Sequence, residues 1–499
     1  MSILRSDSDV KSSQSCPVNP ARQLTFTSGL MLGGLLVGSV ALGCSGNSNS
    51  QTPTASTSPT ASTSPTAADN SSTDSVESAA PAQPTVETNL FELKPESSMP
   101  EVIQSQDTPS VKVDNPQLQD LIDSLHSNYL AVRIEALEKL GEFQTSNDQE
   151  LQAIVTALTH FRAQEFNDFE DRFADKAFAE LGDPLIAEIK RLSALQDQKE
   201  VSKAATAMRA LGGSKLEQFK SVLDDWLAST DTDRHWAALF VLEGLAPESK
   251  VFLPQLREQI HAEDFQTQQI ALRALAELGN EAYPALAEVR ELAESGQNIS
   301  VKSHAAIAMG HIAKGKPEAE EVTKQLMGYL DVFYFIQKQR AMMGLIALGP
   351  DAKAAVDKAK TIMETDKSGL APHAAYFYGL ASGDWDTAIQ SLDTLTSDYT
   401  YGFEALQYLH KAGKNAKPAT ETLLKLLVNE DESISSLAAE TLATIYDKPD
   451  QDDPMFQKVL QRFAQLEDSA ANESTYIAAK QVEKWKAEGI NIPAPNANQ

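Results

Sequence analysis

The 499 residues exceed what one compact core can hold, because hydrophobic cores stop growing near ~250–300 residues. The chain is therefore either several domains or an extended stack, and the Ala-, Leu-, Glu-, Lys- and Gln-rich composition after residue 115 favours a helical stack. A formal net charge of −28 repels phosphate backbones, which disfavours nucleic-acid binding and favours a basic or neutral protein or peptide as partner.

Residues 1–43 have the features of a signal peptide. A polar stretch with Arg5, Lys11 and Arg22 precedes an apolar run at residues 29–42, which is too short and too rich in glycine for a comfortable membrane span. The run ends in Ala41-Leu42-Gly43-Cys44 and resembles a lipobox, although leucine usually stands where Ala41 does. We predict a lipid on Cys44; plain secretory cleavage after Ala41 and an uncleaved anchor are the alternatives. Ser45 follows the cysteine and favours the outer membrane, with the protein on its periplasmic or cell-surface face.

Residues 44–114 are predicted to form a disordered tether. The hexamer Thr-Ala-Ser-Thr-Ser-Pro occurs at residues 54–59 and again at 60–65, and Ser, Thr, Pro, Asn and Asp continue beyond it. Such a segment has too little apolar surface to offset the entropy cost of ordering. As a flexible coil it would reach roughly 45 Å, far enough to hold a folded domain clear of a bilayer.

Residues 115–489 repeat a helical pattern. The sequence VKSHAAIAMGHIA at residues 301–313 defines a thirteen-position frame that fits eleven windows, with a mean spacing of about 34 residues. Positions 5, 8, 9 and 12 form one apolar helix face, and position 5 is alanine throughout. We expect this alanine where helices approach most closely, since a larger side chain would destabilise the stack by ~1–3 kcal/mol. The alanines are Ala136, Ala174, Ala204, Ala238, Ala271, Ala305, Ala341, Ala374, Ala405, Ala438 and Ala478.

These windows resemble the second helix of a HEAT repeat, and the Gly-x-x-Ala-x-Pro junctions at residues 279–284 and 413–418 are similar to the HEAT subtype first described in phycobilisome lyases. The resemblance covers about three quarters of the chain. It implies an all-α fold, a right-handed α-solenoid of about eleven HEAT-like helical hairpins, with residues 490–499 as a flexible tail. Tetratricopeptide repeats share the period, but they expect Leu-Gly in the first helix, whereas here it ends the second. We expect the junction glycines to adopt the αL conformation and the prolines to open the next helix.

The sequence carries no signature of catalysis. It has no H-E-x-x-H, no Gly-rich nucleotide loop and no Gly-x-Ser-x-Gly elbow, and neither cysteine lies in the repeats. The closest histidines, His304 and His311, lack a third metal ligand. We predict no enzyme activity, no metal and no cofactor; bilin attachment, the lyases' own chemistry, is disfavoured in an exported lipoprotein. The predicted function is a membrane-tethered scaffold for protein–protein interaction. The alternative is a carrier of a small apolar ligand or cell-wall fragment.

The predicted partner-binding face comprises positions 3, 7 and 10 of the second helices, opposite the alanine stripe. HEAT stacks usually turn this face toward their concave side. Position 7 is polar at both ends of the chain and mostly apolar in the middle, and residues 329–408 hold twelve of the 33 aromatic residues. Large apolar groups with a polar rim are typical of a binding patch, although packing of these residues on one another is the alternative. The predicted contact residues are Trp236, Phe240, Ile307, Met343, Ile346, Tyr376 and Phe403.

Overall fold

The computed structural model describes residues 112–162, 168–195, 197–296, 298–466 and 472–492. The chain divides into two units, Met1–Glu101 and Val102–Gln499, and the described residues all belong to the second. The predicted signal peptide, Cys44, almost the whole tether and the end of the tail lie outside the described residues.

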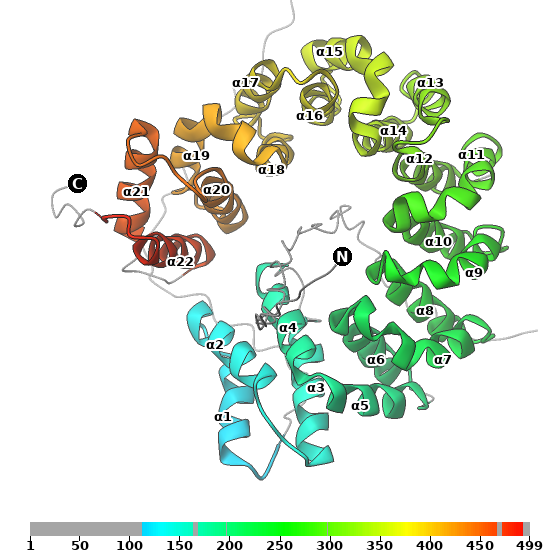
Figure 1. Cartoon of the computed structure of the whole chain (residues 1–499), viewed down its shortest axis with the longest axis vertical. Helices are drawn as coiled ribbons and strands as arrows, with labels where there is room; N and C mark the ends of the chain where they lie inside the picture. Colours follow the sequence, from blue (N-terminus) through cyan, green and yellow to red (C-terminus); the bar gives the residue numbers. More distant parts are fainter. Residues whose placement is uncertain (1–111, 163–167, 196, 297, 467–471, 493–499) are drawn as a thin grey trace, which may run out of the picture. The chain divides into compact units, whose positions relative to one another are not determined.

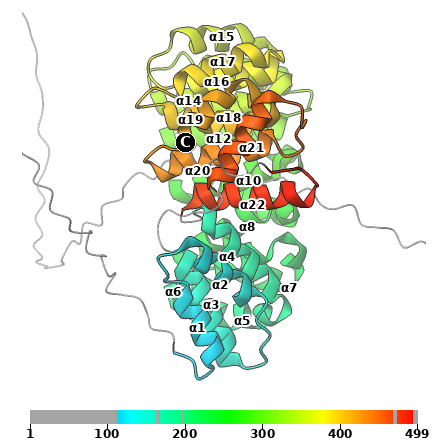
Figure 2. The same ribbon diagram turned by 90° about the vertical axis from the view of Figure 1, so that its left-hand side faces the viewer.

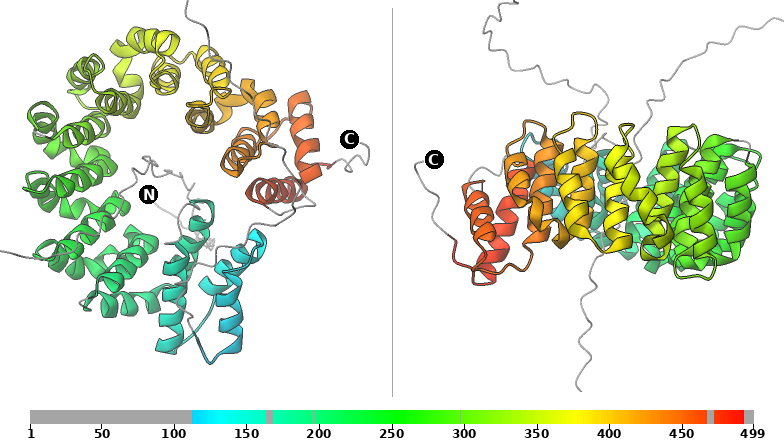
Figure 3. Two further views of the ribbon diagram at one scale, coloured as in Figure 1. Left: turned by 180° about the vertical axis from the view of Figure 1, so that it is seen from behind. Right: turned by 90° about the horizontal axis from the view of Figure 1, so that it is seen from above.

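The described residues form an α-solenoid of helical hairpins, as predicted, with α-helices in two layers (Figures 1 and 3). In each hairpin an odd-numbered helix of the outer layer precedes an even-numbered helix of the inner layer. The outer helices are α1 (Pro116–Ser124), α3 (Asp148–Arg162), α5 (Asp183–Ser193), α7 (Leu216–Leu227), α9 (Leu253–Gln259), α11 (Leu286–Ser295), α13 (Ala319–Tyr329), α15 (Val356–Thr365), α17 (Trp385–Leu395), α19 (Thr420–Leu426) and α21 (Pro454–Leu466). The inner helices are α2 (Leu130–Gly141), α4 (Asp168–Leu181), α6 (Gln198–Leu211), α8 (Thr232–Gly244), α10 (Phe265–Leu278), α12 (Ile299–Ala313), α14 (Phe335–Leu348), α16 (Ala371–Ser382), α18 (Gly402–Ala412), α20 (Glu432–Ile445) and α22 (Glu473–Ala487). Five 3₁₀ segments join inner helices to the next outer ones: η1 (Gly213–Lys215), η2 (Glu248–Phe252), η3 (Gly279–Ala285), η4 (Gly349–Ala355) and η5 (Gly413–Ala419).

The repeat frame falls on the inner helices, and its apolar positions form the core. All eleven alanines at position 5 are at most 2% exposed. Position 9 is also buried throughout, from Leu140 in α2 to Val482 in α22. The predicted stripe is therefore confirmed at positions 5 and 9, where small residues bring neighbouring inner helices together and larger ones fill the space behind them, whereas Lys139 at position 8 of α2 is exposed.

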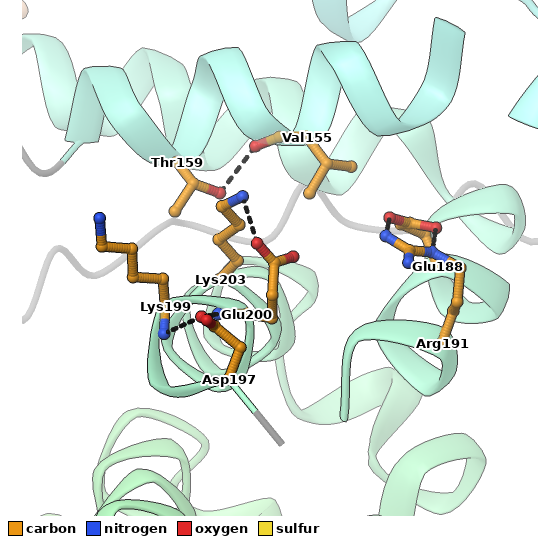
Figure 4. Close-up of polar contacts among 8 residues, drawn as sticks. All are labelled: Val155, Thr159, Glu188, Arg191, Asp197, Lys199, Glu200 and Lys203. Carbon is orange, nitrogen blue, oxygen red and sulfur yellow. Dashed lines mark hydrogen bonds and ion pairs between the residues drawn. The ribbon is translucent and has the colours of Figure 1, made fainter. Parts of the chain in front are cut away.

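Most inner helices begin at a side-chain cap. Asp197 precedes α6 and accepts hydrogen bonds from the backbone N–H groups of Lys199 and Glu200, at 2.8 and 3.3 Å (Figure 4). Such a cap contributes about 1 kcal/mol to helix stability. The same arrangement occurs at Asp231, Asp264, Asn298, Asp431 and Asn472. Helices α2, α14 and α18 differ, because tyrosines stand at the N-cap and make no capping hydrogen bond; these are Tyr129, Tyr334 and Tyr401.

The junction glycines differ in detail from the prediction. Gly279 and Gly413 have the expected positive φ, 54° and 57°, but their ψ is −126°, outside the αL region and accessible only without a Cβ. Pro284 does not open α11; it lies inside η3, and α11 begins two residues later. The reason is that the chain first makes a 3₁₀ turn, which buries Ala282 completely, before the next outer helix starts.

The first and last hairpins contact each other, so the stack closes on itself (Figures 1 and 2). Tyr476 of α22 packs edge-on against two rings of α4, with centroids 6.0 Å from Phe169 and 6.3 Å from Phe173. Beside them, Arg172 of α4 forms a 2.7 Å ion pair with Glu440 of α20. We call this contact between α2/α4 and α20/α22 the closure seam. A linear solenoid would leave these faces to solvent at its two ends.

Candidate functional site

The inner face is formed by positions 3, 7 and 10 of the inner helices, the positions predicted to bind a partner. Side chains of successive helices contact each other along it. Lys176 lies 3.5 Å from Glu138, and Arg273 forms a 2.7 Å ion pair with Glu243. Along the chain, the first aromatic side chains of the inner face lie on α8, between these two ion pairs.

Two of the seven predicted contact residues are exposed on this face. Phe240 of α8 is 38% exposed and Phe403 of α18 is 42% exposed. The Arg209 guanidinium lies 4.1 Å from the centroid of the Phe240 ring, a cation–π contact that leaves part of the ring in solvent. These two phenylalanines are the accessible apolar side chains that the sequence pattern predicted.

Three more of the predicted residues are half-buried. Trp236 donates its indole N–H to the Thr267 hydroxyl at 3.1 Å, which anchors the ring to α10. Ile346 packs against the core from α14. Tyr376 stacks on Tyr408, with centroids 4.9 Å apart, and contacts Trp385 edge-on at 5.8 Å. Burial accordingly raises the pKa of the Tyr376 hydroxyl.

The remaining two, Ile307 and Met343, are buried, with 9% and 7% exposure. The cause is the close approach of α12 and α14. A Cβ on Gly310 would lie 2.0 Å from the Gly344 carbonyl oxygen, and a Cβ on Gly344 would lie 2.4 Å from the Ala306 carbonyl oxygen. Neighbouring helices at this spacing cover both side chains, so Ile307 and Met343 offer a partner little surface.

A row of ionisable groups borders the inner face at position 4. Its members are His304, Arg340, His373 and Glu404, on the consecutive helices α12, α14, α16 and α18. Arg340 and His373 are buried, with 7% and 2% exposure. The prediction from sequence missed this row, although reading position 4 of the frame in order would have found it.

The two histidines of the row are neutral near pH 7. Burial lowers the pKa of His304 to about 4 and that of His373 to about 3. His373 Nε2 lies 3.2 Å from Glu404 Oε1. Burial also raises the pKa of Glu404 to about 7, against the opposing effects of Lys411 and of a hydrogen bond from Gln339.

Arg340 keeps its charge and forms no ion pair within the described residues. Burial, and repulsion by the charge of Arg273, lower its pKa only to about 10. Its Nη1 donates to Met343 Sδ at 3.9 Å, a weak acceptor, and its Nε has no partner. Buried guanidinium groups usually donate to an oxygen acceptor. Arg340 can therefore donate a further hydrogen bond to an oxygen atom of a bound molecule.

The inner face consists of aromatic, aliphatic and charged side chains. No group of three or more His, Cys, Asp or Glu residues in the described part of the chain is placed to hold a metal ion. A pocket lined by Lys448, Pro449, Gln451, Glu488 and Ile490 contains none of the predicted contact residues. None of the described helices is long and apolar enough to span a bilayer.

No protein-family model and no curated protein matches the chain. Among solved structures it is similar to an engineered protein, with 19% identity, 74% of this chain and 99% of that chain covered, and a TM-score of 0.31. It is also similar to Kap121p bound to Pho4p (12% identity, 73% and 46% covered, TM-score 0.39) and to importin beta (12% identity, 75% and 62% covered, TM-score 0.35). The chain spans about half the length of the Kap121p chain that it matches.

Proposed function

We propose that this protein is a non-enzymatic scaffold that holds a protein or peptide partner on its inner face and is anchored to a membrane by a lipid on Cys44. The observation that carries the proposal is the exposure of Phe240 and Phe403 on one face, beside the half-buried Trp236 and Tyr376. Partly exposed aromatic side chains with charged neighbours are the residues from which interface hot spots are usually built.

Arg340 supports a polypeptide rather than a small apolar ligand as the occupant. Its Nε has no partner, and a bound chain offers a carbonyl oxygen at every residue and carboxylate oxygens at Asp and Glu. An apolar ligand would leave this buried donor without a partner, whereas an oxygen acceptor would recover roughly 1–3 kcal/mol. The carrier alternative therefore has less support than the scaffold.

The proposal is tested by affinity capture of the native lipoprotein, with mass spectrometry of both the proteins and the small molecules that co-purify. Phe240→Ala with Phe403→Ala should weaken binding of the captured protein at least tenfold, because hot-spot aromatics typically contribute more than ~2 kcal/mol. Val251→Ala is the matched control, since Val251 is 46% exposed but lies in η2, away from the inner face. Capture of a small molecule alone, or equal partner binding by the double variant and the control, would refute the scaffold.

The anchor is tested separately by fractionation. Cys44→Ala should release the chain from membranes or leave an unprocessed precursor, because each buried CH₂ of a lipid chain contributes about 0.8 kcal/mol and several chains hold almost irreversibly. A Cys44→Ala chain that stays with membranes at mature size would show that the anchor is wrong. That result would not count against the proposal that the inner face binds a partner.

A further inference from the structure

The exposed apolar side chains of the solenoid gather on one edge. Fourteen large hydrophobic side chains are exposed in the described residues, and twelve of them lie in a turn from an outer to an inner helix or in the first turn of that inner helix. The exceptions are Phe240 on the inner face and Val251 in η2. All outer-to-inner turns lie at the same end of their hairpins, so these side chains share one border of the stack, here called the outer-to-inner edge.

The edge is most apolar between α13 and α18. The α13–α14 turn carries Phe333 and Tyr334, which are 92% and 59% exposed and pack edge-on at 5.7 Å. Phe335 and Ile336 continue the run, each 40% exposed. Two turns along, Tyr399 is fully exposed. Single exposed apolar residues are ordinary on protein surfaces, but a contiguous group marks an interaction site.

Helix stability does not account for these aromatics. Tyr334 occupies the N-cap of α14 without a capping hydrogen bond, where other inner helices have a capping Asp or Asn. The same holds for Tyr129 at the start of α2, which is 69% exposed. At these positions the chain forgoes the stabilisation of a cap and exposes an aromatic ring instead.

Contacts between neighbouring turns hold this part of the edge together. Lys358 of α15 forms a 2.6 Å ion pair with Asp331 of the α13–α14 turn and donates to the Met327 carbonyl at 3.1 Å. The Tyr401 hydroxyl donates to the Lys367 carbonyl of the α15–α16 turn at 3.3 Å. These contacts join the α13–α14 turn to helix α15, and the α15–α16 turn to the α17–α18 turn.

The charge of the edge selects the partner. Each of the three turns contains an aspartate, namely Asp331, Asp366 and Asp398; Lys367 is the one basic residue within the turns, and Lys358 of α15 pairs with Asp331. The whole chain has a net charge of −28. Aromatic faces next to carboxylates attract guanidinium and ammonium groups, by cation–π and ionic contacts together. Anionic lipid headgroups would be repelled.

We propose that the outer-to-inner edge between α13 and α18 is a docking surface for an arginine-rich amphipathic segment of a partner protein. The surface adjoins the inner face at Phe403, which both share, but the proposal rests on the other edge residues and does not depend on the function proposed above. Arginine side chains of the segment would lie over the rings of Phe333, Tyr334 and Tyr399, and its apolar side chains would pack against Phe335 and Ile336.

The probe is a labelled amphipathic peptide of leucine and arginine, titrated against the full chain. Phe333→Ala with Tyr399→Ala should weaken its binding at least tenfold with an unchanged Tm, because both side chains are almost wholly in solvent. Tyr334→Asn should weaken binding while raising the Tm, since asparagine supplies the missing cap. Val251→Ala on the opposite edge should change neither.

Two further probes make the proposal falsifiable. The same peptide with glutamate in place of arginine should not bind, and phosphatidylcholine vesicles should not sediment the Cys44→Ala chain, which has no site for the proposed lipid. Equal binding of the two peptides, or undiminished binding by the Phe333/Tyr399 variant, would overturn the docking surface. Sedimentation with vesicles that is lost in that variant would assign the edge to a bilayer instead and would also overturn the proposal.

Discussion

The close approach of α12 and α14 predicts a specific cost for one added methyl group. In Gly310→Ala the new Cβ would lie 2.0 Å from the Gly344 carbonyl oxygen and 2.7 Å from the Gly344 Cα, whereas ordinary contact begins at 3.4 Å. Both atoms belong to the backbone, so no side chain can rotate away and the two helices must separate. Overpacking of this kind costs ~1–3 kcal/mol, and the better helix propensity of alanine returns up to ~1 kcal/mol. With the full gain from helix propensity, we expect a net loss of up to about 2 kcal/mol.

The matched control is Gly328→Ala in α13. No atom lies within 4 Å of a Cβ built on Gly328, and the residue is exposed, so alanine there should only gain helix propensity. Urea unfolding followed by circular dichroism should move the two midpoints in opposite directions, downward for Gly310→Ala and upward for Gly328→Ala. If Gly310→Ala is as stable as Gly328→Ala, the helices are not as close as the structure places them, and the burial of Ile307 and Met343 has another cause.

Four other perturbations have defined outcomes. Burial next to Glu432 raises the pKa of Glu473 from 4.5 to about 7, so the folded chain retains a proton that the unfolded chain has lost; stability should therefore fall as pH rises from about 4.5 to about 7, and Glu473→Gln should make the fall in urea midpoints across that window smaller, with Glu404, whose pKa is raised in the same way, contributing to the remainder. Tyr376→Ala should lower the Tm, because it removes a stacked ring from Tyr408; an unchanged Tm would place Tyr376 outside the core. Arg340→Met should leave the Tm unchanged or raise it, since a buried charge without an ion pair is removed, while partner capture weakens; a fall in Tm would show that Arg340 supports the fold. Truncation after Ser382 should leave a soluble helical stack of lower stability, because hairpins contact mainly their neighbours; complete loss of the helical circular dichroism signal would contradict this.

The repeat architecture was predictable from sequence because the strongest packing constraint recurs with the period of the hairpin. Position 5 must be small wherever two inner helices meet, and the burial of Ala136 through Ala478 shows that one frame satisfies this along the whole stack. The glycine turns were predictable for a similar reason, since positive φ favours glycine. The ψ angles of these glycines were not predictable, because they depend on the 3₁₀ turn that follows each glycine and on where the alanine of that turn is buried.

The closure seam could not be predicted in this way. Closure depends on the sum of many small rotations between neighbouring hairpins, and no local pattern encodes that sum. Phe169 and Tyr476 are far apart in the sequence and contact each other only at the end of the accumulated curvature. The position 4 row was visible in the sequence, but its significance was not, because Arg340 differs from an exposed arginine only in its burial and in the lack of an ion pair.

The contact residues show most clearly what the frame can and cannot determine. Ile307, Met343 and Phe240 all occupy position 7, so the frame treats them as equivalent, yet only Phe240 is exposed. The difference arises from the helix spacing. Gly310 and Gly344 let α12 and α14 approach until their backbones nearly touch, and side chains beside that contact become covered. At α8 the neighbouring Arg209 lies over one part of the Phe240 ring and leaves the rest accessible. The accessibility of a residue on this face to a partner therefore depends on the glycines and long side chains of the adjacent helices as much as on the residue itself.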